Sequence, residues 1–336
     1  MDSREWSRRG AIGGLSALLA VAGARAQPTG TAVPPPPAKA AGPESVLETA
    51  FDDARRVAVP VYLDGKGPYD FVIDTGSNRS VVSAEVAAVL NLPPAGSAEV
   101  HGIISAEPAP LVRVRRLRVS NVISSGLSLP VEPASRLGAD GLLGIDMMKG
   151  RSVAIRFRDQ TFHIAESGGI ILGEASNSRL RSPSAPFVVP ARYRSGQLLI
   201  VDAFAAGRPI TAFLDSGSQV TVANGALLTA ALAVEPDLAQ RLIHSQLVSA
   251  TGQTAAVEFG PLPGLRIGGR DVETLLVAYA DLHVFELWDL KTTPSLLIGV
   301  DILRRFDEVA FDFGRKLISF WPSRTPIHPP PPPGPR

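Results

Sequence analysis

The sequence predicts an all-β protein in which one chain folds into two similar lobes. Two observations carry this prediction. The first is an internal repeat, because residues 68–77 align without gaps to residues 209–218. The second is the alternation of short strand-like apolar segments with turns, in a chain of 336 residues that contains 31 Gly and 30 Pro.

The N-terminal segment, residues 1–26, is predicted to be a signal peptide. Arg8 and Arg9 precede an apolar stretch, and Ala-Arg-Ala at residues 24–26 has the pattern of a cleavage site. The arginine pair resembles a twin-arginine signal, and a general secretory signal is the alternative. We therefore expect an exported protein, either periplasmic or secreted.

Composition divides the rest of the chain. Residues 27–50 are rich in Pro and Ala and are expected to form a linker. Residues 169–186 are punctuated by Gly, Ser, Asn and Pro, and are expected to connect an N-terminal lobe at 51–168 with a C-terminal lobe at 187–324. A run of prolines in residues 325–336 predicts a disordered tail.

Composition also excludes several functional classes. The formal net charge of +1 gives no basic excess for binding nucleic acid. The five histidines lack the spacing of a zinc site, and the absence of Cys excludes disulfides and thiolate ligands. We expect no cofactor, no metal and no nucleic-acid partner. We also expect no transmembrane segment in the mature chain, because no other apolar run is long enough.

Strand signals lead into each copy of the repeat. Residues 57–63 are predicted to be a strand, residues 64–67 a hairpin turn, and residues 71–73 a short apolar strand. Residues 111–122 alternate apolar side chains with arginines, which predicts a half-exposed strand with a solvated basic face. Helical periodicity is confined to short segments, at residues 84–90 and 226–232.

Each repeat carries the same acidic motif after its apolar strand. The first copy is Asp-Thr-Gly-Ser, from Asp74 to Ser77, and the second is Asp-Ser-Gly-Ser, from Asp215 to Ser218. A single copy could be a plain turn, since Asp, Ser, Thr and Gly all favour turns. Two matched copies indicate two halves of one site.

A second matched pair follows downstream. Leu-Leu-Gly-Ile-Asp contains Gly144, and Leu-Ile-Gly-Val-Asp contains Gly299. The acids that end these motifs, Asp146 and Asp301, precede short apolar segments and are expected to cap helices.

Together these motifs resemble those of the aspartic proteases, in their pepsin-like and retropepsin-like branches. The resemblance implies barrel-like lobes with an active-site cleft between them, and Asp74 and Asp215 as one catalytic pair. It implies that Thr75 and Ser216 exchange hydrogen bonds across the lobe interface. The implied activity is that of a monomeric aspartic endopeptidase acting on polypeptides. The alternative is a catalytically silent or highly selective peptide-binding module.

The resemblance also assigns supporting roles. Gly76 and Gly217 would let the two carboxylates approach each other, and glycines in two hairpins, Gly102 and Gly252, are candidates for substrate-covering flaps. The hydroxyls that follow the motifs, Ser77 and Ser218, have two interpretations. They could donate to the carboxylates and lower their pKa, or they could be turn serines bonded to the backbone. His101 could contact substrate or could simply be exposed.

Overall fold

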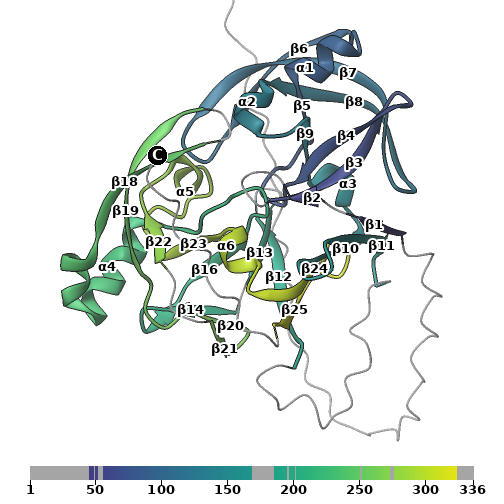
Figure 1. The fold of residues 1–336 in the computed structure, drawn as a ribbon. Coiled ribbons are helices and arrows are strands. Elements are labelled where there is room, and N and C mark those ends of the chain that lie inside the picture. Colours follow the sequence, from purple (N-terminus) through teal and green to yellow (C-terminus); the bar gives the residue numbers. More distant parts are fainter. Residues whose placement is uncertain are drawn as a thin grey trace, which may run out of the picture. The chain divides into compact units, whose positions relative to one another are not determined.

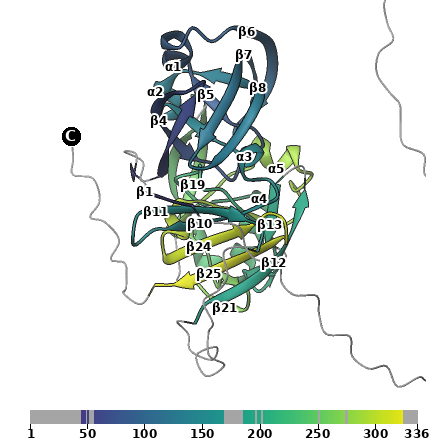
Figure 2. The same ribbon diagram turned by 90° about the vertical axis from the view of Figure 1, so that its right-hand side faces the viewer.

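The computed structural model describes residues 45–48, 50–51, 56–168, 185–194, 197–200, 202–249, 252–272 and 276–323. The predicted signal peptide and tail, and most of the predicted inter-lobe linker, lie outside these residues. The described chain consists mainly of β-strands arranged in three sheets (Figures 1 and 2). The all-β, two-lobed prediction is therefore confirmed.

The N-terminal lobe is a closed barrel. Its strands are β2 (Ala50–Phe51), β3 (Val57–Leu63), β4 (Lys66–Ile73), β5 (Val81–Ser83), β6 (Pro94–His101), β7 (Ala106–Val119), β8 (Val122–Glu132) and β9 (Gly141–Leu143). Six of them, in the order β3-β4-β9-β5-β8-β7, close on themselves because β7 also pairs with β3. The predicted hairpin joins β3 to β4. Residues 111–119 of the predicted half-exposed strand belong to β7, but its predicted end at residue 122 is too late, because residues 120–121 form the turn to β8.

The C-terminal lobe has related strands but does not close by hydrogen bonding. Its larger sheet contains β13 (Gln197–Ile200), β16 (Thr211–Leu214), β17 (Val222–Ala223), β18 (Ile243–Val248), β19 (Thr254–Pro261), β22 (Leu276–Tyr279) and β23 (Ser295–Ile298). A separate small sheet contains β14 (Ala203–Ala205), β15 (Arg208–Pro209), β20 (Arg266–Ile267) and β21 (Arg270–Asp271). Pro261 is the last residue of β19 and Pro263 lies between β19 and β20, and a proline cannot donate to a strand ladder. The long strand of the first lobe is therefore divided in the second.

A third group of strands joins the two lobes. It consists of β1 (Ser45–Glu48), β10 (Arg151–Arg156), β11 (Thr161–Glu166), β12 (Phe187–Arg194), β24 (Phe306–Asp312) and β25 (Leu317–Pro322). Strand β10 follows the N-terminal barrel in sequence, yet it pairs antiparallel with β24 from the end of the chain. Through the pairing of β12 with β13, these six strands are continuous with the larger sheet of the C-terminal lobe, whereas the N-terminal barrel is a separate sheet (Figure 2).

The linker was predicted to extend over residues 27–50, but regular structure begins before its predicted end. Residues 45–48 form β1, which pairs with β11, and Ala50 begins β2. Leu47 packs against the main hydrophobic core, and this burial explains why a segment of linker-like composition adopts regular structure.

Short helices fill the corners between the strands. They are α1 (Ala84–Val89), α2 (Ala134–Leu137), α3 (Ile145–Met148), α4 (Gly225–Val234), the 3₁₀ helix η1 (Pro236–Arg241), α5 (His283–Leu287) and α6 (Val300–Leu303). Both predicted helices, α1 and α4, are present. Each begins at a side-chain cap, since Ser83 Oγ accepts from the N–H of Val86 and Asn224 Oδ1 accepts from the N–H of Leu227.

The two acidic motifs lie at equivalent strand ends. Strand β4 runs parallel to β9 and ends directly before Asp74, and β16 runs parallel to β23 and ends directly before Asp215. Every residue of these paired segments is buried except Thr211, which is half-buried. Each aspartate is thus carried by a rigid core strand, which is the kind of support that a precise site requires.

Candidate active site

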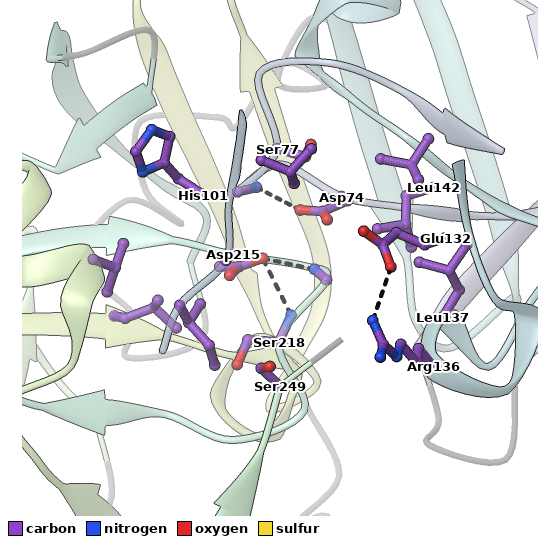
Figure 3. A pocket seen from close by; sticks show the side chains of 18 of the residues that line it. Asp74, Ser77, His101, Glu132, Arg136, Leu137, Leu142, Asp215, Ser218 and Ser249 are labelled. Atoms are coloured by element: carbon purple, nitrogen blue, oxygen red, sulfur yellow. Dashed lines mark hydrogen bonds and ion pairs between the residues drawn. The ribbon is translucent and has the colours of Figure 1, made fainter. Parts of the chain in front are cut away.

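Asp74 and Asp215 come together at the interface between the lobes. Both side chains are buried, and their carboxyl groups are hydrogen-bonded to each other. They lie on one cavity of about 970 Å³ that is lined by residues of both lobes (Figure 3). The two copies of the sequence repeat therefore form a single site.

Thr75 and Ser216 form a symmetric set of hydrogen bonds beneath this pair. The N–H of Thr75 donates to Ser216 Oγ (3.1 Å), and the N–H of Ser216 donates to Thr75 Oγ1 (3.0 Å). Each hydroxyl then donates to a carbonyl of the opposite lobe, Thr75 to Leu214 O (3.0 Å) and Ser216 to Ile73 O (2.7 Å). The exchange implied by the family resemblance is present, and it holds the two aspartate loops in register.

Gly76 and Gly217 permit the close approach of the carboxyl groups. A Cβ atom on Gly76 would lie 2.5 Å from Cγ of Asp215, and one on Gly217 would lie 2.5 Å from Cγ of Asp74. Any larger residue at either position would therefore displace the aspartate of the other lobe. The N–H groups of the same glycines donate to the carboxylate within their own loop, to Asp74 Oδ1 at 2.9 Å and to Asp215 Oδ1 at 2.8 Å.

Burial is the largest influence on the pKa values of the two aspartates. It raises the pKa of Asp215 to about 8, with the nearby charge of Asp74 as the second cause. Burial also raises the pKa of Asp74, against the opposing effects of the Gly76 N–H, the hydrogen bond from Asp215 and the positive charge of Arg56. Because burial raises the pKa of both carboxyl groups, the pair is expected to hold one shared proton near neutral pH.

The downstream glycine motifs lie beside the aspartate loops. In the first lobe, a Cβ on Gly144 would lie 2.6 Å from the carbonyl carbon of Arg79. The N–H of Gly144 donates to Ser80 Oγ (3.0 Å), and Ser80 donates to Asp146 Oδ1 (2.7 Å). The C-terminal lobe repeats the arrangement with Gly299, Thr221 and Asp301, at 3.0 Å and 2.6 Å for the corresponding bonds.

The prediction that Asp146 and Asp301 cap helices was wrong. Gly144 and Gly299 occupy the N-cap positions of α3 and α6, so each aspartate lies within the first turn. There it accepts from the backbone N–H and the hydroxyl of the segment after the catalytic loop. Sequence reasoning missed the hydroxyl partners, although Ser80 and Thr221 occupy equivalent positions of the repeat.

Ser77 and Ser218, the last residues of the two acidic motifs, are turn serines. Ser77 Oγ donates to the carbonyl of Arg79 (2.6 Å), and Ser218 Oγ donates to the carbonyl of Val220 (2.9 Å). The interpretation in which these hydroxyls donate to the carboxylates is therefore not supported. It is the backbone N–H of Ser218, rather than its hydroxyl, that donates to Asp215 Oδ1 (3.1 Å).

The first predicted flap is a hairpin that reaches the opposite lobe. Gly102 lies in the turn between β6 and β7 and lines the cavity. The carbonyl of Ile103 accepts from the N–H of Val284 in α5 (3.2 Å). His101 Nδ1 lies 3.0 Å from His283 Nε2, and the two rings are stacked. His101, for which sequence left two interpretations, is exposed and contacts the other lobe while lining the cavity.

The second predicted flap lies in the C-terminal lobe. The hairpin of β18 and β19 carries Gly252 near its tip, with a φ of +80° that favours glycine. Residues before the tip, including Leu247 and Ser249, line the cavity. Gly252 itself lies against Arg136 of the first lobe, since a Cβ there would lie 2.9 Å from Arg136 Nε.

Arg56 is a site residue that sequence reasoning did not find. It is buried just before β3, lines the cavity, and donates to the carbonyl of Leu137 and to that of Gly217 (3.4 Å). Gly217 belongs to the aspartate loop of the other lobe, so Arg56 bridges the lobes beside the carboxyl pair. A charged residue ahead of an apolar strand gives no signal of this role in a single sequence.

Comparison with known proteins agrees with this geometry. Residues 59–147, which span the first aspartate motif and the first glycine motif, match the aspartyl protease family model. This part of the chain is therefore similar to the aspartyl proteases. The fold is similar to that of the aspartic proteinase from Irpex lacteus, with a TM-score of 0.50 and 12% sequence identity over 84% of this chain and 98% of the other. No curated protein matches the sequence.

Within the described residues, no group of three or more His, Cys, Asp or Glu side chains could hold a metal ion. None of the helices in that part of the chain is long and apolar enough to cross a membrane.

Proposed function

We propose that this protein is an active aspartic endopeptidase. The observation that carries the proposal is the pair of buried, mutually hydrogen-bonded carboxyl groups, one from each lobe, on a cavity between the lobes. Both copies of the motif are intact, and the glycines that permit the approach are in place. A silent relative would be expected to lose one of these features.

The proposed reaction needs only water and the two carboxyl groups. Ionised Asp74 accepts a proton from a water bound between the pair, and the oxygen of that water attacks the scissile carbonyl carbon. Asp215 donates a hydrogen bond to the carbonyl oxygen and stabilises the tetrahedral intermediate. Proton transfer to the leaving nitrogen then breaks the C–N bond, releases a carboxylic acid and an amine, and returns the pair to its singly protonated state.

The surroundings of the pair support a peptide substrate. The cavity is large enough for several side chains of an extended peptide, and a hairpin from each lobe borders it. Because one chain supplies both aspartates, we propose that the enzyme acts as a monomer. From the N-terminal sequence we further propose that it acts after export, in the periplasm or outside the cell.

Cleavage of a mixed peptide pool by the mature chain, residues 27–336, tests the proposal. Reaction in H₂¹⁸O should place one ¹⁸O in the new C-terminal carboxyl group of each product, as direct attack by water requires. Pepstatin should inhibit, and the Asp74→Asn variant should be inactive. If peptides bind but none is cleaved at any pH at which the chain is folded, the alternative of a silent peptide-binding module replaces this proposal.

A further inference from the structure

The two halves of the cavity differ in charge. Equivalent leucines of the two glycine motifs, Leu142 and Leu297, line the floor on the Asp74 side and the Asp215 side. On the Asp215 side the wall is completed by apolar residues, among them Phe259 and Trp288. On the Asp74 side, the lining contains further charged residues: the carboxylates of Glu99 and Glu132, and the guanidinium groups of Arg56, Arg79 and Arg136.

The sequence repeat shows what the second lobe has in place of Glu132. In the first lobe β5 pairs parallel with β8, which sets Val82 opposite Val131, the residue before Glu132. In the second lobe the equivalent strand β17 pairs parallel with β22, which sets Ala223 opposite Tyr279. The residue after Tyr279 is Ala280, so the charge of Glu132 has no counterpart across the pseudo-twofold axis.

Glu132 is a buried carboxylate whose hydrogen bonding is incomplete. Its side chain is 8% exposed, and Arg136 Nη1 lies 3.4 Å from its Oε2. Among the described residues, no donor reaches its other oxygen, Oε1. Burial raises the pKa of Glu132, and the charge of Arg136 opposes this effect only in part. Oε1 is not among the buried unpaired polar atoms of the described residues, so it is open to the cavity and can accept a hydrogen bond from a ligand.

Arg136 leaves Glu132 accessible to a ligand. Its side chain is 42% exposed, and its Nη1 also lies 3.8 Å from Glu107 Oε2. Arg136 can therefore keep one carboxylate partner when another cation approaches Glu132. Figure 3 shows Glu132 between Asp74 and Arg136, beside Leu137 and Leu142, so that a side chain entering from the catalytic pair would reach it.

We propose that Glu132 determines substrate specificity, so that the Asp74 side of the cavity takes a Lys or Arg side chain while the Asp215 side takes a large apolar one. An acidic substrate side chain on the Asp74 side would lie near both Glu132 and ionised Asp74. Repulsion between the like charges would disfavour its binding. The aliphatic part of a lysine would lie along Leu137 and Leu142, with its ammonium group at Glu132. This inference rests on the proposed endopeptidase function.

Matched peptides test the inference directly. The peptides share one apolar sequence and differ at a single residue next to the scissile bond, the one whose side chain enters the Asp74 side of the cavity. This residue is Lys, norleucine or Glu, and kcat/KM is measured for each peptide. Wild type is expected to cleave the Lys peptide at least about tenfold faster than the norleucine peptide, since a charge-assisted hydrogen bond is worth about that factor. Glu132→Gln should bring this ratio close to one and leave cleavage of the norleucine peptide nearly unchanged.

Glu107→Gln is the matched control, because Glu107 contacts the same arginine but does not line the cavity. It should keep the preference for Lys. A preference that survives in Glu132→Gln, or a wild-type preference for norleucine or Glu, overturns the inference.

Binding separates this inference from the proposed reaction. Fluorescence anisotropy of labelled Lys and norleucine peptides is measured with Asp215→Asn, alone and combined with Glu132→Gln. Tighter binding of the Lys peptide that requires Glu132 supports the subsite even if wild type cleaves nothing. Equal binding of the two peptides overturns the subsite, whether or not the enzyme is active.

Discussion

Thr75 and Ser216, residues of different lobes, each accept a hydrogen bond from the backbone N–H of the other and each donate to a carbonyl of the opposite lobe. Both side chains are about 1% exposed, so water cannot replace these bonds. The relationship couples the position of one aspartate loop to that of the other. It makes the integrity of the site a property of the lobe interface rather than of either lobe alone.

Removing one of these hydroxyls should damage both stability and catalysis. Thr75→Val keeps the shape of the side chain but leaves a buried N–H and a buried carbonyl without partners. We expect a loss of about 2–4 kcal/mol in the free energy of unfolding, measured by urea denaturation. Thr75→Ser retains the hydroxyl and should lose much less. A Thr75→Val variant as stable and active as wild type would contradict the role assigned to this set of hydrogen bonds between the lobes.

The catalytic aspartates are expected to favour activity at the expense of stability. Folding raises the pKa of Asp215 to about 8. The contribution of protonated Asp215 to the free energy of unfolding is therefore fully present below its ordinary pKa of 3.8 and is lost as pH rises toward 8. Asp215→Asn should abolish turnover, by about 10³-fold or more. At pH 8 its Tm should exceed that of wild type by roughly 2–4 °C. Calorimetry at pH 4 and pH 8 measures the difference, which should be smaller at pH 4.

The pH profile of kcat/KM should report the shared proton. Activity needs one ionised and one protonated carboxyl group. It should fall at high pH as Asp215 loses its proton, near pH 8, and at low pH as Asp74 gains one, above its ordinary value of 3.8. The expected profile is a bell that includes pH 6. An enzyme active only below pH 4 would contradict the strong burial of the pair.

The serines after the motifs should not set this profile. Their hydroxyls donate to the carbonyls of Arg79 and Val220 and leave the carboxylates to backbone donors. In the double variant Ser77→Ala/Ser218→Ala, both limbs of the kcat/KM profile should stay within about 0.3 pH units of wild type. An upper limb that moves to higher pH in a folded variant would instead show that the hydroxyls reach the dyad during catalysis.

The sequence predicted the repeated acidic motifs, but it missed Arg56 and the hydroxyl partners of Asp146 and Asp301. Asp74 and Asp215 were predicted to pair because each follows the same strand and precedes the same Ser/Thr-Gly step. Local sequence shows which residues are equivalent but not which atoms they touch. The acceptors of the Ser77 and Ser218 hydroxyls could therefore be settled only by the fold.

The same limit applies to the fold. Short apolar runs and the Asp64-Gly65 turn located β3 and β4 because hairpin signals are local. The sheet shared by β10 and β24 pairs segments about 150 residues apart, and no local pattern reports such a pairing. Leu47 shows the converse case, in which tertiary burial overrides a linker-like composition.

Variants of Arg56 test how a residue at the lobe interface changes the pKa of Asp74. Its positive charge lowers the pKa of Asp74, in opposition to the larger effect of burial. In Arg56→Gln that charge is lost, so the pKa of Asp74 should rise and the acidic limb of the kcat/KM profile should move to higher pH. Arg56→Lys keeps the charge and should leave this limb near its wild-type position, although both variants weaken the contacts with Leu137 and Gly217.

Comparing the two Arg56 variants separates charge from packing, because a loss of packing lowers the free energy of unfolding in both. We expect the limb to move by about 0.5–1 pH unit in Arg56→Gln alone, with folding confirmed at each pH by circular dichroism. Equal displacement in both variants would mean that Arg56 acts by holding the lobes in place. A displacement to lower pH in Arg56→Gln would contradict the sign of its electrostatic effect on Asp74.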